Sequence, residues 1–153
     1  MTRPIPDIDD PDFAPFWEGT AQSELRLVHC ADCDKPRWPP RPICGWCRSL
    51  DFEWRAISPE GRLYTWTVAE HQTTPDIPAP YVVGIVEVHA DPVVRMLGQV
   101  VCDPEHLRIG MQLTAQFDRV SDEAILVNWT SATPVPGDNL PSAPYAEALD
   151  GLG

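Results

Sequence analysis

Hydrophobic and polar residues alternate along most of the chain from Arg62 to Ala132. Such alternation is typical of β-strands with one buried face. Turn-forming residues divide the region into separate runs, and Asp91-Pro92 and the SDE segment are two of these breaks. The runs are RLYTWTVAE, PYVVGIVEVHA, VVRMLGQVV, MQLTAQFDRV and AILVNWTSA. The pattern therefore predicts five strands in succession.

Five strands of this length, joined by turns within about 75 residues, are typical of a small closed barrel. An OB-type barrel fits the strand count better than an immunoglobulin-like sandwich, which needs about seven strands. Strict alternation would place Leu63, Thr65 and Thr67 on one face of the first strand, opposite Tyr64, Trp66 and Val68. Gly84 interrupts the second run and predicts a bulge or bend.

The segment after Asp12 predicts a short helix, with Asp12 as its N-cap and Gly19 loosening or ending it. Phe13, Phe16 and Trp17 follow at helical spacing. We expect this aromatic face to dock on its own domain. The alternative is that it covers a partner or the entrance to a ligand site.

Two further strands are predicted on either side of a cysteine-rich segment: LRLVH leads into it and FEWRAI leaves it. Between them, KPRWPPRP holds four prolines in eight residues. Proline lacks a backbone N–H, so this segment is expected to be a stiff loop and cannot be a helix or a central strand.

Four of the five cysteines form two Cys-x-x-Cys pairs, Cys30/Cys33 and Cys44/Cys47, with ten residues between Cys33 and Cys44. Two such turns facing one another supply four thiolates, the ligand set of a closed structural zinc site. Disulfides are disfavoured in the cytoplasmic location expected below, and a redox-active pair is disfavoured because no βαβ pattern surrounds either pair. Iron would use the same ligands as zinc. His29 precedes Cys30 and could compete as a ligand, but we interpret it as a solvated neighbour of the site.

The 153 residues carry a formal net charge of −12, which disfavours general binding to nucleic acid. Seven of the eleven basic residues nevertheless lie in the segment from Arg26 to Arg62, so this small region could bind an anion. The acidic N-terminus does not look like a secretory signal, and no apolar run is long enough to span a bilayer. We therefore expect a cytoplasmic protein without membrane contact.

The mainly β organisation expected from these patterns has four parts. They are an extended arm and short helix (1–24), a rubredoxin-like zinc ribbon (25–57), a five-stranded OB-fold barrel (58–133) and a flexible tail (134–153).

Taken together, the ribbon and barrel resemble the zinc-ribbon/OB-fold family of accessory proteins in acyl-CoA metabolism. The resemblance rests on FAPFWEGTAQSELRLVHCADCDKPRWPPRPICGWC, GRLYTWTVAEH, APYVVGIVEV and DPEHLRIGMQL. One departure is Asp34-Lys35, which stands where the family often has glycine.

This resemblance implies a non-catalytic subunit that forms a hetero-oligomer with a thiolase-superfamily enzyme, such as a thiolase or a thiolase-like aldolase of steroid side-chain breakdown. The subunit would assist the binding or transfer of acyl-CoA, and the partner would supply the catalytic residues.

Candidate contacts to acyl-CoA or the partner are Phe16 and Trp17 on the helix and Arg37, Trp38 and Arg41 on the proline-rich loop. Arginine pairs with phosphate and a flat indole stacks on adenine or packs on pantetheine. Alternatively, Trp38 packs the ribbon onto the barrel and the arginines are only solvated. Two other functions remain open: a nucleic-acid-binding module and a rubredoxin-like electron carrier.

Overall fold

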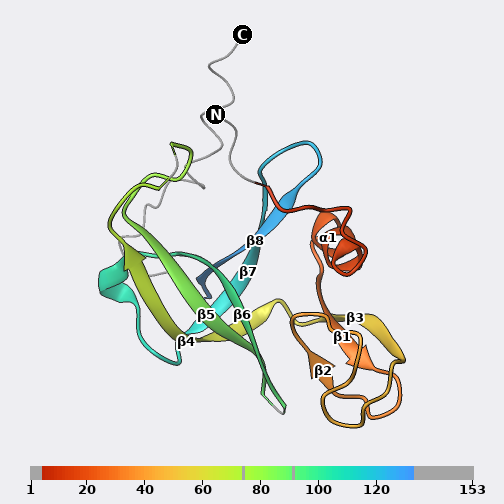
Figure 1. Ribbon diagram of the computed structural model, residues 1–153. Coiled ribbons are helices and arrows are strands. Elements are labelled where there is room, and N and C mark those ends of the chain that lie inside the picture. Colours follow the sequence, from red (N-terminus) through yellow and green to blue (C-terminus); the bar gives the residue numbers. More distant parts are fainter. Residues whose placement is uncertain (1–4, 74, 91, 133–153) are drawn as a thin grey trace.

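The computed structural model describes residues 5–73, 75–90 and 92–132, and shows a small ribbon sheet beside a β-barrel (Figure 1). The predicted flexible tail lies outside the described residues. The elements in chain order are α1 (Ala14–Ala21), β1 (Leu25–Cys30), β2 (Pro36–Arg37), β3 (Phe52–Ile57), β4 (Glu60–Ala69), β5 (Tyr81–Ala90), β6 (Val93–Val101), the 3-10 helix η1 (Pro104–His106), β7 (Gln112–Arg119) and β8 (Ile125–Ser131).

The five predicted strands form a closed barrel in the order β4-β5-β6-β8-β7, in which β4 also pairs with β7. All neighbouring strands are antiparallel except β6 and β8, which are parallel. This is a Greek-key barrel of the OB type. The fold predicted from the alternating runs is therefore confirmed.

The first barrel strand departs from strict alternation because it contains a bulge. The register of β4 against β5 shifts between Leu63 and Thr65. Beyond the shift, Trp66 and Val68 pack against the core that already contains Leu63, while Thr65 is exposed. The predicted assignment of Leu63 and Trp66 to opposite faces is wrong, because the bulge adds one residue and exchanges the two faces.

Gly84 lies in a regular part of β5, opposite Trp66 and Gly98, so the bulge predicted there is wrong. The register of β5 against β6 instead shifts between Glu87 and His89. A Cβ atom at Gly84 would lie 2.6 Å from the Val100 side chain. Glycine is therefore required at this position by close packing inside the barrel.

Helix α1 begins one residue later than predicted, with Phe13 at the N-cap and no side-chain cap. Asp10 forms a turn whose carbonyl accepts hydrogen bonds from the N–H groups of Phe13 and Ala14, and this turn takes the place of an Asp12 cap. Gly19 does not end the helix, which continues to Ala21. A Cβ at Gly19 would lie 2.8 Å from the Arg26 side chain, so glycine makes room for β1.

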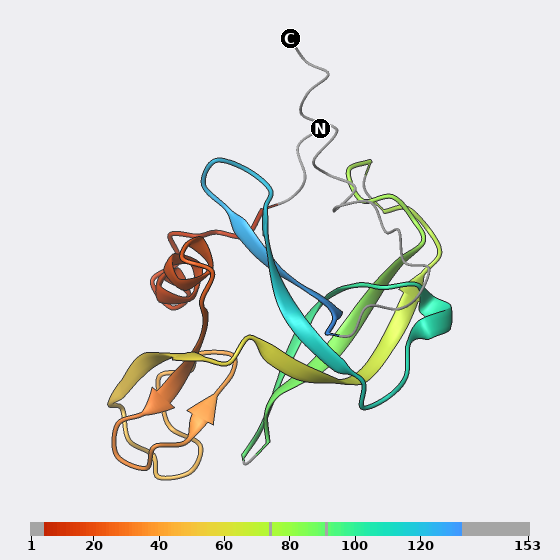
Figure 2. The same cartoon turned by 180° about the vertical axis from the view of Figure 1, so that it is seen from behind.

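The ribbon is a three-stranded antiparallel sheet with β1 in the centre and β2 and β3 at the edges. Figure 2 shows from behind that this sheet and the barrel lie side by side, with α1 next to β1. Part of the proline-rich loop forms the edge strand Pro36–Arg37, which pairs with Val28 and His29. A proline is tolerated there because an edge strand has one unpaired side.

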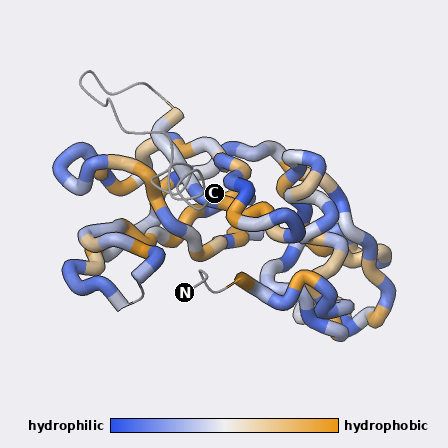
Figure 3. The backbone as a smooth tube through the Cα atoms, turned by 90° about the horizontal axis from the view of Figure 1, so that it is seen from above, coloured by the Kyte–Doolittle hydropathy of each residue, from blue (hydrophilic) through white to orange (hydrophobic). Residues whose placement is uncertain are grey.

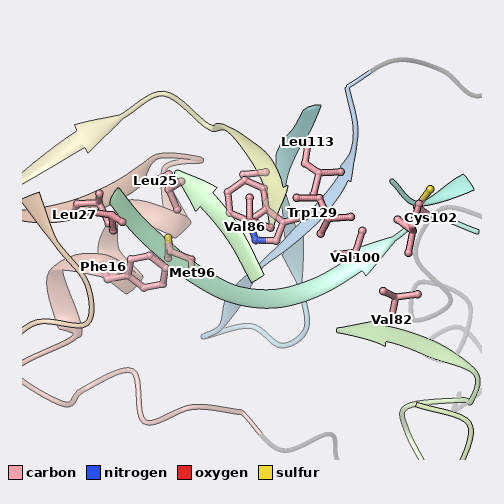
Figure 4. Packing of buried hydrophobic residues seen from close by; sticks show 14 residues of the cluster. Phe16, Leu25, Leu27, Val82, Val86, Met96, Val100, Cys102, Leu113 and Trp129 are labelled. Carbon is pink, nitrogen blue, oxygen red and sulfur yellow. The ribbon is translucent and has the colours of Figure 1, made fainter. Parts of the chain in front are cut away.

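One hydrophobic core joins the helix, the ribbon and the barrel. In Figure 4 it runs from Leu27 and Leu25 of β1, past Phe16 and Met96, to the barrel residue Trp129. Figure 3 shows short hydrophobic and hydrophilic segments alternating along the tube. Within the described ranges, no helix is both long enough and apolar enough to cross a bilayer.

Candidate metal centre and adjoining aromatic groove

The two Cys-x-x-Cys turns have the same backbone hydrogen bonds. In the first, Asp34 N–H donates to the Cys30 carbonyl at 3.0 Å, and in the second, Arg48 N–H donates to the Cys44 carbonyl at 3.0 Å. Asp34 and Arg48 both adopt left-handed backbone angles, with φ of 59° and 66°. These equivalent turns, or knuckles, therefore present their sulfurs in the same way from opposite sides of the site.

The four sulfurs of Cys30, Cys33, Cys44 and Cys47 lie within 4.8 Å of one another. The shortest approaches connect the two knuckles: Cys30 Sγ to Cys47 Sγ at 3.5 Å and Cys33 Sγ to Cys44 Sγ at 3.7 Å. A tetrahedral ion with metal–sulfur bonds of 2.3 Å would separate its ligands by about 3.8 Å, whereas a disulfide requires about 2.05 Å. The four cysteines are thus placed to bind a metal.

The electrostatics of the knuckles favour thiolates unevenly. The backbone N–H groups of Cys47 and Trp46 lower the pKa of the Cys44 thiol to about 6. The Ser49 N–H is the largest single influence on Cys47 and favours its thiolate. The Cys30 sulfur, burial and the sulfurs of Cys33 and Cys44 together outweigh it, and the pKa of Cys47 is raised to about 12. Four adjacent sulfurs resist full ionisation by themselves, and a bound cation supplies the charge that offsets their repulsion.

The interpretation of His29 as a solvated side chain is wrong. It lies on the central strand β1, both ring nitrogens are buried, and neither has a hydrogen-bond partner among the described residues. Burial and the charge of Arg55 lower the pKa of this imidazole. The metal-binding cluster found in the described part of the chain consists of the cysteines and does not include His29.

Three of the five predicted contact residues lie together. The Trp38 ring is 4.7 Å from Phe16, and Phe16 is 4.9 Å from Trp17, measured between ring centroids. Phe16 is buried in the core, whereas Trp17 and Trp38 are half-buried. Arg37 is next to Trp38, and its Nη2 donates to the carbonyl of the exposed Arg41 at 3.0 Å. Trp38 thus packs α1 against the ribbon.

Trp38 also borders two cavities, and β6 supplies one wall of each. Local sequence patterns do not predict these cavities, because β6 is distant from Trp38 in the sequence. One, of about 270 Å³, lies between α1 and the barrel; the other, of about 320 Å³, lies between the ribbon and the start of β6. The exposed Leu97 lines the first and Arg95 lines the second. Alternation along β6 identified the strand, but nothing in the chain order indicated that its outer face would lie opposite the ribbon.

The ribbon also exposes four large apolar side chains within ten residues of sequence, which we call the knuckle patch. Its members are Ile43, Trp46, Leu50 and Phe52. Large exposed apolar side chains concentrated in one short segment make this part of the ribbon a candidate interaction surface.

Comparison with known proteins finds two family models that match successive parts of the chain and meet within β3. The family model "ChsH2, rubredoxin-like zinc ribbon domain" matches residues 17–53, and "ChsH2, C-terminal OB-fold domain" matches residues 54–118.

Two curated relatives illustrate the similarity, one of comparable length and one much longer. A DUF35 domain-containing scaffold protein of Methanocaldococcus jannaschii is 38% identical over 63% of this chain and 69% of its own length. The 3-oxo-4,17-pregnadiene-20-carboxyl-CoA hydratase alpha subunit of Mycobacterium tuberculosis is 32% identical over 69% of this chain. The present chain spans only 33% of that hydratase subunit.

Among solved structures, a chain of the Ltp2-ChsH2(DUF35) aldolase superposes with a TM-score of 0.75 at 30% identity. The match covers 86% of the present chain and 100% of the other. With both domains matched and a scaffold relative covered over more than two thirds of its length, this chain belongs to the DUF35 family of ChsH2-type zinc-ribbon/OB-fold proteins.

Proposed function

We propose that this protein is a non-catalytic scaffold subunit that docks on a thiolase-superfamily enzyme and assists its handling of acyl-CoA. The observation that carries the proposal is the match to the Ltp2-ChsH2(DUF35) aldolase, which covers 100% of the matched chain. That chain is part of an assembly named as an aldolase, and other relatives are named scaffold proteins. A thiolase-like aldolase is therefore the partner class that we favour.

The architecture supports a scaffold role. A four-sulfur site has no open coordination position for a substrate, so the metal we propose there, zinc, stabilises the ribbon and takes no part in chemistry. The ribbon buries few side chains of its own, and a metal contributes the missing folding energy. It thereby holds the knuckle patch in a fixed arrangement, and rigid, exposed apolar groups suit a stable interface.

The acyl group can be proposed more narrowly. The hydratase relative carries a pregnadiene-carboxyl-CoA in its name, and the structural relative is an aldolase. We therefore propose a steroid or similar lipid CoA thioester as the substrate of the complex. In this role the present chain contributes binding surface, and the partner contributes the reacting side chains.

The test is co-expression with a thiolase-superfamily enzyme from the same organism, followed by affinity purification and size-exclusion chromatography. We expect a stable hetero-complex. The variant Leu50→Asp places a charge on the knuckle patch, where Leu50 is 65% exposed, and should weaken the complex on the order of tenfold or more.

The matched control is Ile109→Asp, because Ile109 is 74% exposed but lies in the connection between η1 and β7, outside the ribbon. It should leave the complex intact, and both variants should keep their bound metal. Turnover of an acyl-CoA at enzymatic rates by this chain alone would refute the non-catalytic role. Failure of every thiolase-superfamily enzyme tested to associate would refute the scaffold role.

A further inference from the structure

The ribbon sheet has one long edge strand, β3 (Figure 1). All six residues of β3 pair with β1, and the part of the chain that the structure describes places no strand on the other side of β3. The opposite edge is formed by β2, which has only two residues. Of the two edges, β3 is therefore the one long enough to pair with a further strand.

The hydrogen bonds of the ribbon identify which backbone groups of β3 face outward. Directly beside the strand, Ala31 N–H donates to the Asp51 carbonyl at 3.0 Å. Bonded and non-bonded pairs alternate along an antiparallel ladder, so Glu53 and every second residue after it bond to β1. The N–H and C=O groups that point to the free edge are those of Phe52, Trp54 and Ala56.

The side chains of β3 divide into an apolar and a charged set, because successive side chains of a strand point to opposite faces. Phe52, Trp54 and Ala56 share one face. Phe52 is 46% exposed, Ala56 is exposed and Trp54 is half-buried. Glu53 and Arg55 share the other face and form an ion pair with each other. Opposite charges therefore flank Trp54 along the strand.

We propose that β3 pairs with β3 of a second copy of this chain, in antiparallel orientation about a twofold axis at Trp54. The outward N–H and C=O groups of the two strands bond to each other, and the two three-stranded ribbons become one continuous sheet. Phe52 of each copy lies opposite Ala56 of the other, and Glu53 of each lies opposite Arg55 of the other. The same surface is used twice, as in an isologous dimer.

Charge selects this register. Glu53 and Arg55 form the non-hydrogen-bonded pairs of the new ladder, where opposite Cα atoms are about 4.5 Å apart and the side chains are closest. Shifting the register by two residues in one direction would place Glu53 opposite Glu53, and shifting it in the other would place Arg55 opposite Arg55. Like charges directly opposite one another destabilise a strand pair. The register centred on Trp54 joins opposite charges instead.

The sizes of the apolar side chains fit the same register. On each side of the axis, the exposed Phe52 ring lies opposite Ala56, the smallest side chain of the strand. An unrelated strand would have to match both this order of sizes and this order of charges, so the self-match favours a second copy. The paired area is small and the net charge of −12 adds repulsion, so we expect a Kd on the order of 10 µM at physiological salt.

The inference is tested by analytical ultracentrifugation of the purified, metal-loaded full chain, over concentrations that span the expected Kd. Wild type should pass from monomer to dimer. Glu53→Arg makes both facing pairs positive and Arg55→Glu makes both negative, so each variant alone should dimerise on the order of tenfold more weakly. An equimolar mixture of the two variants should form a heterodimer, because each facing pair then joins opposite charges.

A second pair of variants tests the backbone ladder. Ala56→Pro removes an N–H that points to the free edge, so it should abolish dimerisation and leave the pairing of β3 with β1 intact. The matched control, Ala56→Ser, keeps this N–H and should dimerise like wild type. Melting curves and metal content verify folding. Wild type that stays monomeric, or a dimer that neither Ala56→Pro nor the charge variants weaken, would overturn the inference.

This self-association does not depend on the proposed function, because it is measured on the present chain alone. Of the knuckle patch, Phe52 takes part in the dimer, whereas Ile43, Trp46 and Leu50 precede β3. If wild type stays monomeric and Ala56→Pro prevents binding of the thiolase-superfamily enzyme, the edge pairs with that enzyme and the inference is wrong. If wild type dimerises as described but no such enzyme binds, the dimer stands and the scaffold role is refuted.

Discussion

At the scale of single residues, the knuckles depend on two positions with left-handed backbone angles. Asp34 and Arg48 each directly follow the second cysteine of a pair. Side chains are disfavoured in this region, which explains why glycine is common at such positions, and aspartate tolerates it better than arginine. Asp34 is further held by its ion pair with Arg55, which also lowers the pKa of the Asp34 carboxyl.

Replacing Arg48 by glycine should therefore stabilise the ribbon by about 0.5–1 kcal/mol, because it removes the left-handed strain. Thermal unfolding of the metal-loaded protein measures the change. Asp34→Gly is the informative comparison: it relieves the same strain but loses the contact with Arg55. A lower melting temperature for Arg48→Gly than for wild type would contradict this account of the knuckle.

At the scale of elements, α1 is too short to be stable alone and has no side-chain cap. Its position is set by packing: Phe16 is 3% exposed and contacts Trp38 of the ribbon, and α1 also touches β8 of the barrel. The expectation that the aromatic face docks on its own domain is confirmed for Phe16. The helix therefore links the ribbon to the barrel.

Truncating Phe16 to alanine should cost about 3–5 kcal/mol, since it opens a cavity at the meeting point of the three parts. Phe13→Ala should cost clearly less, because Phe13 is only partly buried. Urea-induced unfolding followed by tryptophan fluorescence gives both values. Equal costs for the two variants would mean that the helix is not anchored through Phe16.

At the scale of the whole molecule, metal and core stabilise different parts. The ends of β1 illustrate this: Cys30 belongs to the four-sulfur site, while Leu25 and Leu27 belong to the core shared with the barrel. The barrel is closed by hydrogen bonds between its own strands and does not depend on the four-sulfur site. Loss of the metal should therefore release the knuckles first and leave the barrel folded.

We expect about one zinc per chain as purified, by elemental analysis, in line with a four-thiolate site. Chelation should then raise hydrogen exchange strongly between Cys30 and Phe52, weakly at Leu25–Leu27, and little in the barrel. Uniform loss of protection would contradict independent stabilisation. A red, iron-containing protein with reversible redox activity would instead favour the electron carrier.

Features that depend on local spacing could be predicted before the structure was known. Two Cys-x-x-Cys pairs indicated the metal centre, because the spacing within each pair places both sulfurs on one side of a metal. Period-two alternation indicated each barrel strand, because successive side chains of a strand point to opposite faces. Asp12 as a cap and Gly84 as a bulge were wrong, since both are decided by neighbours outside the segment.

Contacts between segments far apart in the sequence became clear only from the three-dimensional fold. The bulge after Leu63 turned Trp66 toward the core, and the barrel placed the outer face of β6 against a ribbon that lies far away in sequence. Arg37 and Arg95, 58 positions apart in the numbering (95 − 37), come to line one cavity. Local patterns cannot encode such pairings, because they follow from how closed sheets and a shared core pack in three dimensions.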